Sequence, residues 1–285
     1  MPDTSPMPPG PLADVAHEPC VAKPDPILVA DEVRRSFGGL TAVDVDHLEV
    51  QRGVITAVIG PNGAGKTTFF NLLTGFDSPD HGSWSFNGVD LTGQASHHIA
   101  RKGLVRTFQL TKALSRLTVM DNMKLGAVDQ RGERLLNAVF SALWRDQERE
   151  IEGRATEILE RFQLLDKQDD YAGELSGGQR KLLEMARALM VGPELILLDE
   201  PMAGVNPALV QSLLRHVTQL RDDGMSVIFV EHDMDVVMNI SDWVAVLAEG
   251  RVIAEGPPAS ILSNPDVISA YLGSDEGADG FLDGE

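Results

Sequence analysis

Cysteine is almost absent from this sequence, which holds one, Cys20, among 285 residues. One thiol excludes an internal disulfide and a zinc site built from cysteines, as fits a reducing compartment. Aromatic residues make up only 5% of the chain, and no apolar run approaches the roughly 20 residues that span a bilayer. The N-terminus also lacks the basic start and apolar stretch of a signal peptide. We therefore expect a chain that stays in the cytosol, without direct membrane insertion.

Basic residues are scarce as well. The chain carries 24 Lys and Arg against 43 Asp and Glu, which gives a formal charge of −19 and a pI near 4.7. A surface that binds nucleic acid or anionic lipid needs an excess of Lys and Arg, so we expect no nucleic-acid partner. Of the seven His, only His97 and His98 are adjacent, and adjacent residues do not share a helix face. We expect no metal site built from His.

The two ends of the chain differ in composition from its middle. Residues 1–26 hold eight of the sixteen prolines and little that could form a core, which predicts a disordered tail. Residues 274–285 carry five acidic residues and no basic one, which predicts a solvated acidic tail. At 285 residues the chain is long enough for one large domain or two modest ones.

A glycine-rich loop lies between a predicted strand over residues 54–59 and a predicted helix that includes residues 69–73. Its spacing, G-x-x-x-x-G-K-T, predicts a phosphate-binding loop. Backbone N–H groups and the positive end of the helix would bind phosphates, Lys66 would reach the β- and γ-phosphates, and the Thr67 hydroxyl would ligate Mg²⁺. We expect a nucleoside triphosphate at Gly60, Pro61, Asn62, Gly63, Ala64, Gly65, Lys66, Thr67 and Thr68.

Two residues at predicted strand ends allow more than one interpretation. Phe37 ends a predicted strand over residues 27–37, where it either stacks on a purine ring or is a half-buried strand residue. Gln109 ends a short predicted strand over residues 104–109, where a glutamine is usually a surface residue. Residue type alone decides neither case.

Residues 110 to about 174 are rich in helix formers and lack proline, which predicts a helical subdomain. An apolar stripe over residues 135–144 within it packs on the protein's own core or faces a partner. Further on, Ser176, Gly177, Gly178 and Gln179 open a helix, with Ser176 as N-cap and two glycines that expose N–H groups to an anion. By itself this sequence would predict an ordinary capped helix. Because the same chain also contains a phosphate loop, it predicts a second phosphate contact.

Two buried strands are predicted to end in polar residues, at the edge where parallel sheets carry functional groups. Residues 195–198 lead into Asp199, which we expect to hold Mg²⁺ through a water, and Glu200, which would orient or deprotonate the attacking water. A helix cap is the alternative for this pair, but Asn206 with the following proline takes that role. Residues 227–230 lead into His232, which either reaches the γ-phosphate or lies on the surface.

In this order the elements resemble the ATP-binding cassette (ABC) ATPases: phosphate loop, strand-end Gln, helical insert, LSGGQ, LILLDE and strand-end His. The resemblance covers about residues 27–273. It implies an α/β fold, with a P-loop ABC ATPase core built on a mixed or parallel sheet, an N-terminal antiparallel β element and an inserted α-helical subdomain. The catalytic core would take residues 27–109 and 191–273, and the helical subdomain residues 110–190.

The resemblance also implies ATP and Mg²⁺ as cofactors and a role for each candidate residue. Phe37 stacks on the base, and residues 60–68 and 176–179 contact the phosphates. The metal ligands are Thr67, Gln109 and Asp199. The catalytic residues are Glu200, His232, which is the γ-phosphate switch, and Gln109, which senses the γ-phosphate.

Finer motifs resemble the ATPase subunits of bacterial high-affinity branched-chain amino-acid importers. They are FGGL at 37–40, TGF at 74–76, RTFQ at 106–109, EHDM at 231–234, NPDV at 264–267 and AYLG at 270–273. Two residues depart from the wider family. Phe37 replaces the usual Tyr and keeps the stacking ring. Asn206 replaces the usual Asp, so we expect no carboxylate-based contact across a dimer at this position.

A partner arrangement follows from the position of LSGGQ. On the helical subdomain it lies away from its own phosphate loop and reaches a γ-phosphate only in a second molecule, so we expect a head-to-tail homodimer or heterodimer around two ATP molecules. The resemblance implies membrane permease subunits docked near residues 110–122, at the cytoplasmic face of the membrane. The alternatives are a subunit of a transporter for urea, short amides or lipid, and a soluble cassette protein acting on ribosomes or DNA.

Overall fold

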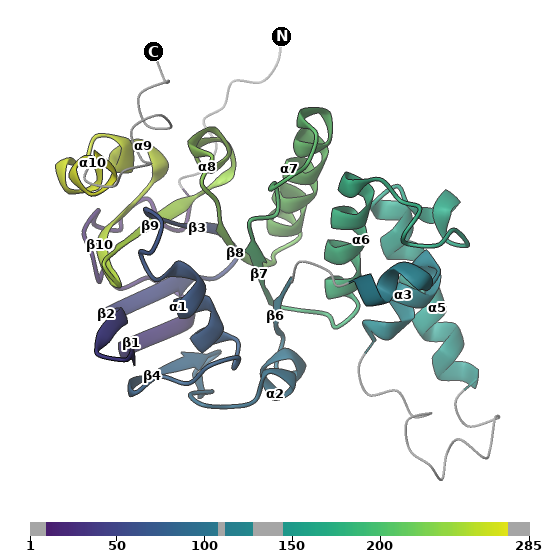
Figure 1. Cartoon of the computed structure of the whole chain (residues 1–285), viewed down its shortest axis with the longest axis horizontal. Helices are drawn as coiled ribbons and strands as arrows, with labels where there is room; N and C mark the ends of the chain where they lie inside the picture. The colour runs from purple at the N-terminus through teal and green to yellow at the C-terminus, as the bar shows by residue number, and fades with distance from the viewer. Residues whose placement is uncertain (1–9, 108–111, 128–144, 273–285) are drawn as a thin grey trace. The chain divides into compact units, whose positions relative to one another are not determined.

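The structure is a computed structural model that describes residues 10–107, 112–127 and 145–272 (Figure 1). The chain divides into two compact units, Met1–Gly93 with Val230–Glu285, and Gln94–Phe229. Gln109, the apolar stripe over residues 135–144 and the acidic tail over residues 274–285 lie outside the described residues.

The first unit contains an antiparallel sheet with the strand order β2-β1-β4-β5. β1 (Pro26–Phe37) and β2 (Leu40–Gln51) form a long hairpin, which turns at two glycines of positive φ, Gly38 and Gly39. β4 (His81–Phe86) pairs with the other edge of β1, and β5 (Val89–Asp90) pairs with β4. This sheet confirms the predicted N-terminal antiparallel element.

A second group of strands in this unit carries the glycine-rich loop. β3 (Ile55–Ile59) runs parallel to β9 (Trp243–Ala248), and β10 (Arg251–Gly256) is antiparallel to β9. Every residue of β3 is buried, as expected for a strand covered on both faces. The helices in the described part of this unit are α1 (Lys66–Leu73), α8 (Met234–Ile240), α9 (Pro258–Leu262) and α10 (Pro265–Leu272).

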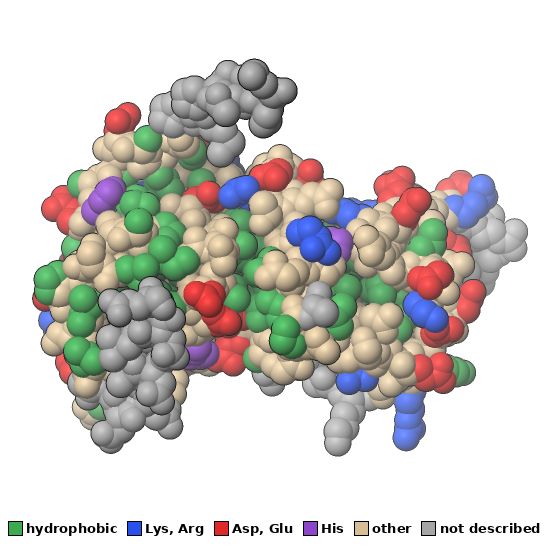
Figure 2. All heavy atoms as spheres, turned by 90° about the horizontal axis from the view of Figure 1, so that it is seen from above, with side chains coloured by type: hydrophobic (Ala, Val, Ile, Leu, Met, Phe, Trp, Pro, Cys, Tyr) green, Lys and Arg blue, Asp and Glu red, His purple; other side chains and the backbone are tan. Residues whose placement is uncertain are grey.

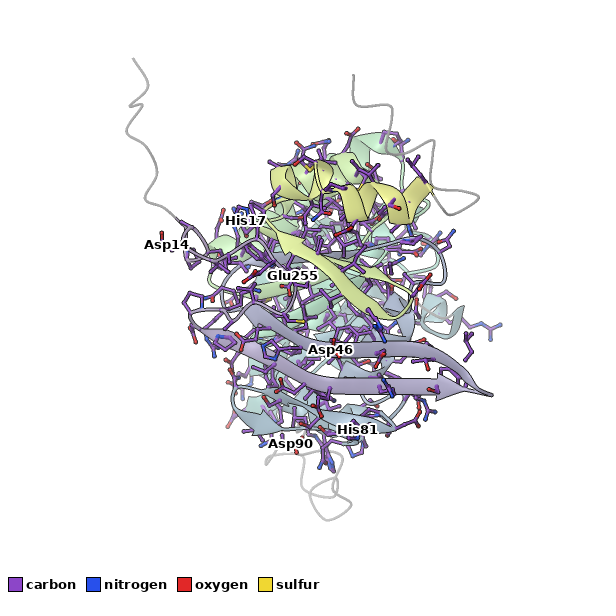
Figure 3. The ribbon with its side chains drawn as sticks, turned by 90° about the vertical axis from the view of Figure 1, so that its left-hand side faces the viewer. Asp14, His17, Asp46, His81, Asp90 and Glu255 are labelled. Carbon is purple, nitrogen blue, oxygen red and sulfur yellow. The ribbon has the colours of Figure 1, made fainter. Side chains whose placement is uncertain are left out.

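Residues 10–25 correct the sequence analysis, which predicts a disordered tail over residues 1–26. Leu12 is buried in a cluster with Val54 and Trp243. The His17 ring meets the Trp243 ring edge-on, with 6.0 Å between the ring centroids. His17 is seen next to the end of β10 in Figure 3. The prediction fails because these few apolar residues complete the core of the unit and do not need to build one of their own.

A buried ion pair also holds this N-terminal segment. Lys23 Nζ lies 2.8 Å from Glu255 Oε2, and both side chains are almost fully buried. The Trp243 indole N–H and the Cys20 backbone N–H donate to the same carboxylate, each at 3.1 Å. Burial raises the pKa of the Glu255 carboxyl, while Lys23 opposes that shift. The segment is therefore fixed to β10 by a carboxylate that accepts three hydrogen bonds, two of them from the segment itself.

The second unit holds β6 (Leu104–Arg106), β7 (Leu195–Asp199) and β8 (Ser226–Val230), in the order β8-β7-β6. β6 and β7 are parallel, so their carboxyl ends lie at the same edge. Among its described residues the helices are α2 (Ser96–Arg101), α3 (Val119–Leu125), α5 (Arg145–Arg161), α6 (Gly177–Leu189) and α7 (Pro207–Asp222), with short 3₁₀ turns η1 (Lys112–Arg116) and η4 (Leu165–Lys167). The α/β class and its inserted helices are as predicted.

Two surface properties bear on partners. In the described ranges, every helix is too short or too polar to cross a membrane. On the face drawn in Figure 2, Lys and Arg side chains are interspersed with Asp and Glu and form no continuous basic patch.

Candidate functional site

The glycine-rich loop joins β3 to α1, as the sequence predicts. Its glycines at 60, 63 and 65 have φ of 148°, 78° and 98°, a region that disfavours other residues. A Cβ on Gly60 would lie 2.0 Å from the Leu247 carbonyl oxygen, and one on Gly65 would lie 2.2 Å from the Ala42 carbonyl oxygen. Gly63 has no atom within 4 Å of its Cβ position. Packing therefore fixes two of these glycines, while the third presents its backbone to open space.

The loop is supported by segments from elsewhere in the unit. In the turn between β9 and β10, the Gly250 N–H donates to the Ala64 carbonyl at 3.0 Å, and the Gly250 carbonyl accepts from the Asp44 N–H at 2.8 Å. The Tyr271 hydroxyl of α10 is hydrogen-bonded to the Gly60 backbone, and burial raises the pKa of Tyr271 to about 12. Neither support is indicated by the sequence around the loop.

Lys66 and the start of α1 form the polar part of the loop. The Lys66 side chain is buried, and its Nζ donates to the carbonyls of Gly60 at 2.6 Å and Pro61 at 3.0 Å. The N-cap of α1 is Gly65, so no side chain caps the first turn. Thr67 is exposed on that turn. Helix N–H groups, an ammonium and a hydroxyl at one helix start are the donors that fit a phosphate chain.

Phe37 and His232 belong to the same unit as this loop. Phe37 ends β1, and 49% of its surface is exposed. The Arg35 guanidinium lies 4.8 Å from the centroid of the Phe37 ring. His232 follows β8 and is exposed, and Asp233 beside it caps α8 by accepting from the Val236 N–H at 3.2 Å.

In the second unit, the predicted capped helix is α6. The Gln179 N–H donates to Ser176 Oγ at 3.3 Å, and the Ser176 N–H donates to Gln179 Oε1 at 2.9 Å, which is a reciprocal capping box. Gly177 has no atom within 4 Å of its Cβ position, whereas a Cβ on Gly178 would lie 2.3 Å from Leu209 Cδ1. One glycine keeps the backbone open, and the other allows α6 to approach α7.

Asp199 and Glu200 stand at the carboxyl end of β7, as predicted. One Asp199 carboxylate oxygen lies 2.5 Å from the Arg106 guanidinium at the end of β6. No sequence prediction included this pair; the one signal for it is that two neighbouring parallel strands both end in charged residues there. Glu200 has φ of 45°, a left-handed conformation that costs a non-glycine residue about 1–2 kcal/mol. Such strain is common at functional sites.

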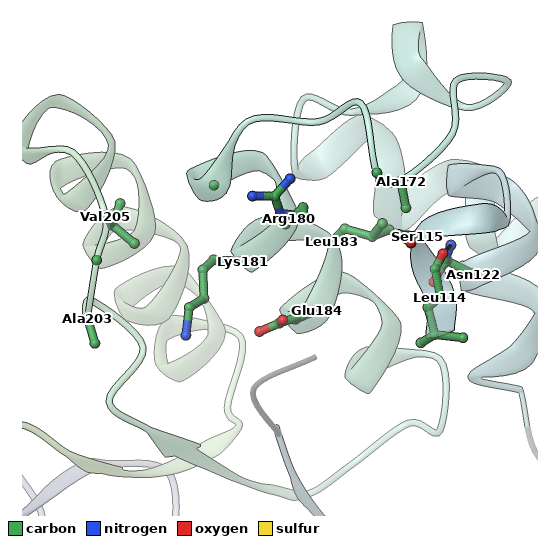
Figure 4. A pocket seen from close by; sticks show the side chains of 13 residues that line it. Leu114, Ser115, Asn122, Ala172, Arg180, Lys181, Leu183, Glu184, Ala203 and Val205 are labelled. Atoms are coloured by element: carbon green, nitrogen blue, oxygen red, sulfur yellow. Dashed lines mark hydrogen bonds between the residues drawn. The ribbon is translucent and has the colours of Figure 1, made fainter. Parts of the chain in front are cut away.

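A cavity of about 440 Å³ lies in the second unit, between α6, α3 and the loop after β7 (Figure 4). The Lys181 and Glu184 side chains of α6 line it. Asn122 lines it as well, and its amide donates to the carbonyls of Leu114, Leu117 and Thr118 at 2.9–3.4 Å. The other lining residues are Leu114, Ser115, Ala172, Gly173, Gly177, Arg180, Leu183, Ala203, Gly204 and Val205.

The predicted site residues thus form two groups. The first unit holds Phe37, residues 60–68 and His232, and the second holds residues 176–179, Asp199 and Glu200. Within the second group, Asp199 shares a small recess with Lys181 and Glu184 of α6. The role of Gln109 stays a prediction, since that residue lies outside the described ranges.

Comparison with known proteins agrees with this order of elements. The family described as "ABC transporter" matches residues 43–203, which include both glycine-bearing helix starts. The family described as "Branched-chain amino acid ATP-binding cassette transporter" matches residues 251–277, which include Tyr271.

The chain is also similar to curated proteins and solved structures, and each match covers nearly the whole length of the similar protein. The chain is 44% identical over 250 residues to the probable branched-chain amino acid transport ATP-binding protein LivG of Archaeoglobus fulgidus, which covers 88% of this chain and 96% of that protein. It is 40% identical to the high-affinity branched-chain amino acid transport ATP-binding protein BraF of Pseudomonas aeruginosa, over 87% of this chain and 98% of that protein. A crystal structure of an ATP-binding cassette of an ABC transporter, in its ADP conformation, aligns with a TM-score of 0.77 and 39% identity over 87% of this chain and 99% of that one.

Proposed function

Since the chain belongs to the ATP-binding cassette (ABC) transporter family and is an ATPase, we propose that it powers the import of branched-chain amino acids through a membrane permease. The observation that carries this choice of substrate is the match of residues 251–277 to a family described by that substrate. The relatives in Archaeoglobus fulgidus and Pseudomonas aeruginosa support it, because both are named for branched-chain amino acid transport.

ATP binds, in this proposal, along the first unit. The phosphates occupy the loop from Gly60 to Thr68, where α1 begins without a side-chain cap and the Lys66 ammonium lies close to the loop carbonyls. The base stacks on Phe37, whose exposed ring ends β1. Support comes from the chemistry of the donors, since N–H groups at a helix start and an ammonium bind phosphate oxygens well.

Hydrolysis uses the residues at the ends of the buried strands. Thr67, Gln109 and Asp199 would hold Mg²⁺, which would neutralise charge on the phosphates. Glu200 accepts a proton from the attacking water, and His232 contacts the γ-phosphate. In this structure Asp199 is paired with Arg106, so a metal ligand at this position would share its carboxylate with that guanidinium.

A second ABC ATPase subunit, identical or related, completes each site in this proposal. Its residues 176–179 bring the open backbone at Gly177 to the γ-phosphate. Permease subunits dock around residues 110–122 at the cytoplasmic face of the membrane. The exposed side chains of Leu125 and Tyr171 lie close to this region in the fold, since Leu125 ends α3 and Tyr171 forms a β-bridge with Thr118.

Replacement of Glu200 tests the catalytic assignment. We expect Glu200→Gln to leave ATP binding intact and to abolish steady-state hydrolysis, because the amide keeps the shape of the side chain but cannot accept the proton. Phosphate release and equilibrium nucleotide binding measure the two effects separately. Unchanged turnover would remove Glu200 from the catalytic role.

The transport assignment is tested by reconstitution. The chain should co-purify with permease subunits from detergent-solubilised membranes, and with them and their solute-binding protein in liposomes it should drive ATP-dependent uptake of leucine, isoleucine or valine. Uptake of urea or short amides instead would move the chain to another transporter. Recovery in the ribosome pellet, with no permease, would contradict a transport role.

A further inference from the structure

The ring of Phe37 has a cation on one of its faces. Arg35 and Phe37 are two residues apart on β1, so their side chains lie on the same side of the strand. The Arg35 guanidinium carbon is 4.8 Å from the ring centroid, within the range of a cation–π contact. Nearly half of the Phe37 surface nevertheless remains exposed. The ring therefore has one side occupied by Arg35 and keeps an exposed surface for another flat group.

Two carboxylates hold the Arg35 guanidinium in place. Its Nε and one terminal nitrogen lie 2.9 Å from the two oxygens of Asp77, and its other terminal nitrogen lies 2.6 Å from Asp80. The second Asp80 oxygen accepts from the Ser36 N–H at 2.7 Å. A guanidinium bound in this forked manner has a defined plane, which an ammonium could not supply. The surface under the ring is therefore rigid.

Asp77 and Asp80 connect this contact to the phosphate-binding helix. They follow α1 in the chain, and the N–H groups of Phe76 and Asp77 donate to the Asn71 carbonyl in its last turn, at 3.0 and 3.2 Å. The tip of the β1–β2 hairpin and the end of α1 are thereby joined through Arg35. The ring is held at a fixed place relative to the helix whose first turn carries Lys66.

We propose that Arg35 is a positioning residue for the nucleotide base. It covers one face of Phe37 and fixes the ring relative to α1, so that a purine stacks on the exposed face while the triphosphate lies at the start of α1. The stack would favour a purine over a pyrimidine, because the larger base covers more of the ring. This inference rests on the proposed base-stacking role of Phe37.

The test compares Arg35→Met with Arg34→Met. Arg34 is the matched control, because it is the preceding residue on β1, points to the other side of the strand and pairs with Asp44. Isothermal titration calorimetry would measure the affinity of each variant for ATP, CTP and inorganic triphosphate. We expect Arg35→Met to weaken ATP binding about two- to fivefold, which corresponds to the energy of one cation–π contact. The same change should weaken CTP binding less. Binding of inorganic triphosphate should not change, and Arg34→Met should change none of the three.

A double-mutant cycle shows whether Arg35 acts through the ring. In a Phe37→Ala background, Arg35→Met should have no further effect on ATP affinity. A persistent effect, or an equal loss of inorganic triphosphate binding, would overturn the proposal, because Arg35 would then act on the phosphate loop. Unchanged ATP affinity in Phe37→Ala alone would instead refute the stacking role itself. If Arg35→Met does not fold, Asp80→Asn removes one of the two anchors and is expected to give a smaller loss in the same direction.

Discussion

Two helix starts in this chain carry glycines, and they are built differently. The N-cap of α1 is Gly65, a left-handed residue with φ of 98°, and no side chain caps the first turn of this helix. The N-cap of α6 is Ser176, which exchanges hydrogen bonds with Gln179 in a complete capping box. One helix thus leaves its first turn without a side-chain partner, while the other satisfies part of its own.

From this difference we propose two kinds of anion contact. At α1 the uncapped turn stands next to the buried Lys66 ammonium, so the loop has both the N–H groups and the positive charge that a triphosphate needs. The loop at the start of α6 has no cation within residues 176–179, and only Gly177 presents an open backbone. We therefore expect the first helix start to bind ATP by itself, and the second to add a contact to ATP that is already held.

Among the changes that test this comparison, removal of the Lys66 side chain is expected to have the largest effect, which is a loss of ATP affinity. Lys66→Ala should weaken ATP binding about a hundredfold, because the charge-assisted hydrogen bonds of an ammonium to phosphate contribute about 2–3 kcal/mol. Equilibrium binding to the isolated chain measures the loss. Lys167→Ala, which removes a lysine paired with Asp170 on the surface, is the control and should bind ATP normally. An unchanged affinity in Lys66→Ala would refute the phosphate-loop assignment.

The two glycines of α6 should differ in their tolerance of a methyl group. Gly178→Ala should lower the free energy of unfolding by about 1–3 kcal/mol, because the added Cβ would overlap Leu209. Gly177→Ala meets no neighbouring atom and should cost much less. Denaturant unfolding measures both. Leu209→Ala should partly rescue Gly178→Ala, and the absence of rescue would show that the cost does not come from this contact.

Loss of the cap on α6 should have a smaller effect on stability. Ser176→Ala removes the acceptor for the Gln179 N–H and should cost about 1 kcal/mol. ATP affinity of the isolated chain should stay unchanged, since this helix start is not expected to bind ATP by itself. A fall in that affinity to the extent seen for Lys66→Ala would remove the distinction between the two helix starts.

Replacement of Tyr271 is expected to have the smallest effect on stability at neutral pH, and to change how stability depends on pH at high pH. Its pKa is about 12 in the folded chain, above the ordinary value of 10.0, because the phenol is buried beside Gly60. The unfolded chain therefore loses this proton first, and stability is lost as the pH rises from 10 towards 12. Tyr271→Phe should remove this part of the pH dependence, as followed by unfolding at a series of alkaline pH values. Tyr171→Phe, at the other tyrosine, is the control.

Local sequence patterns predicted much of the fold and the positions in it of several candidate site residues. The strand–loop–helix around residues 60–68, the capped start of α6 and the strand that ends at Asp199 each depend on residues close together in the chain. The α/β class with its antiparallel β element and helical insert was implied by the resemblance of these elements, in their order, to the ABC ATPases.

Contacts between distant residues could not be predicted in this way. Lys23 and Glu255 are 232 residues apart, and nothing near either shows that they form a buried pair, so the N-terminal segment was wrongly expected to be disordered. The pairs of Arg106 with Asp199 and of Arg35 with Asp77 are of the same kind. An arginine in a strand is usual, and its function depends on which carboxylate the fold brings to it.

The most direct measurement tests whether the start of α1 in one chain and the start of α6 in another contact the same ATP molecule. In a Cys20→Ser, Glu200→Gln background, one population of the chain would carry Asn62→Cys and the other Gly177→Cys. These are exposed positions in the phosphate loop and at the start of α6. We predict that ATP with Mg²⁺ produces a crosslink between the two chains, or between this chain and the partner ATPase that co-purifies with its permease. A crosslink that forms equally well without nucleotide, or none in either pairing, would contradict the account.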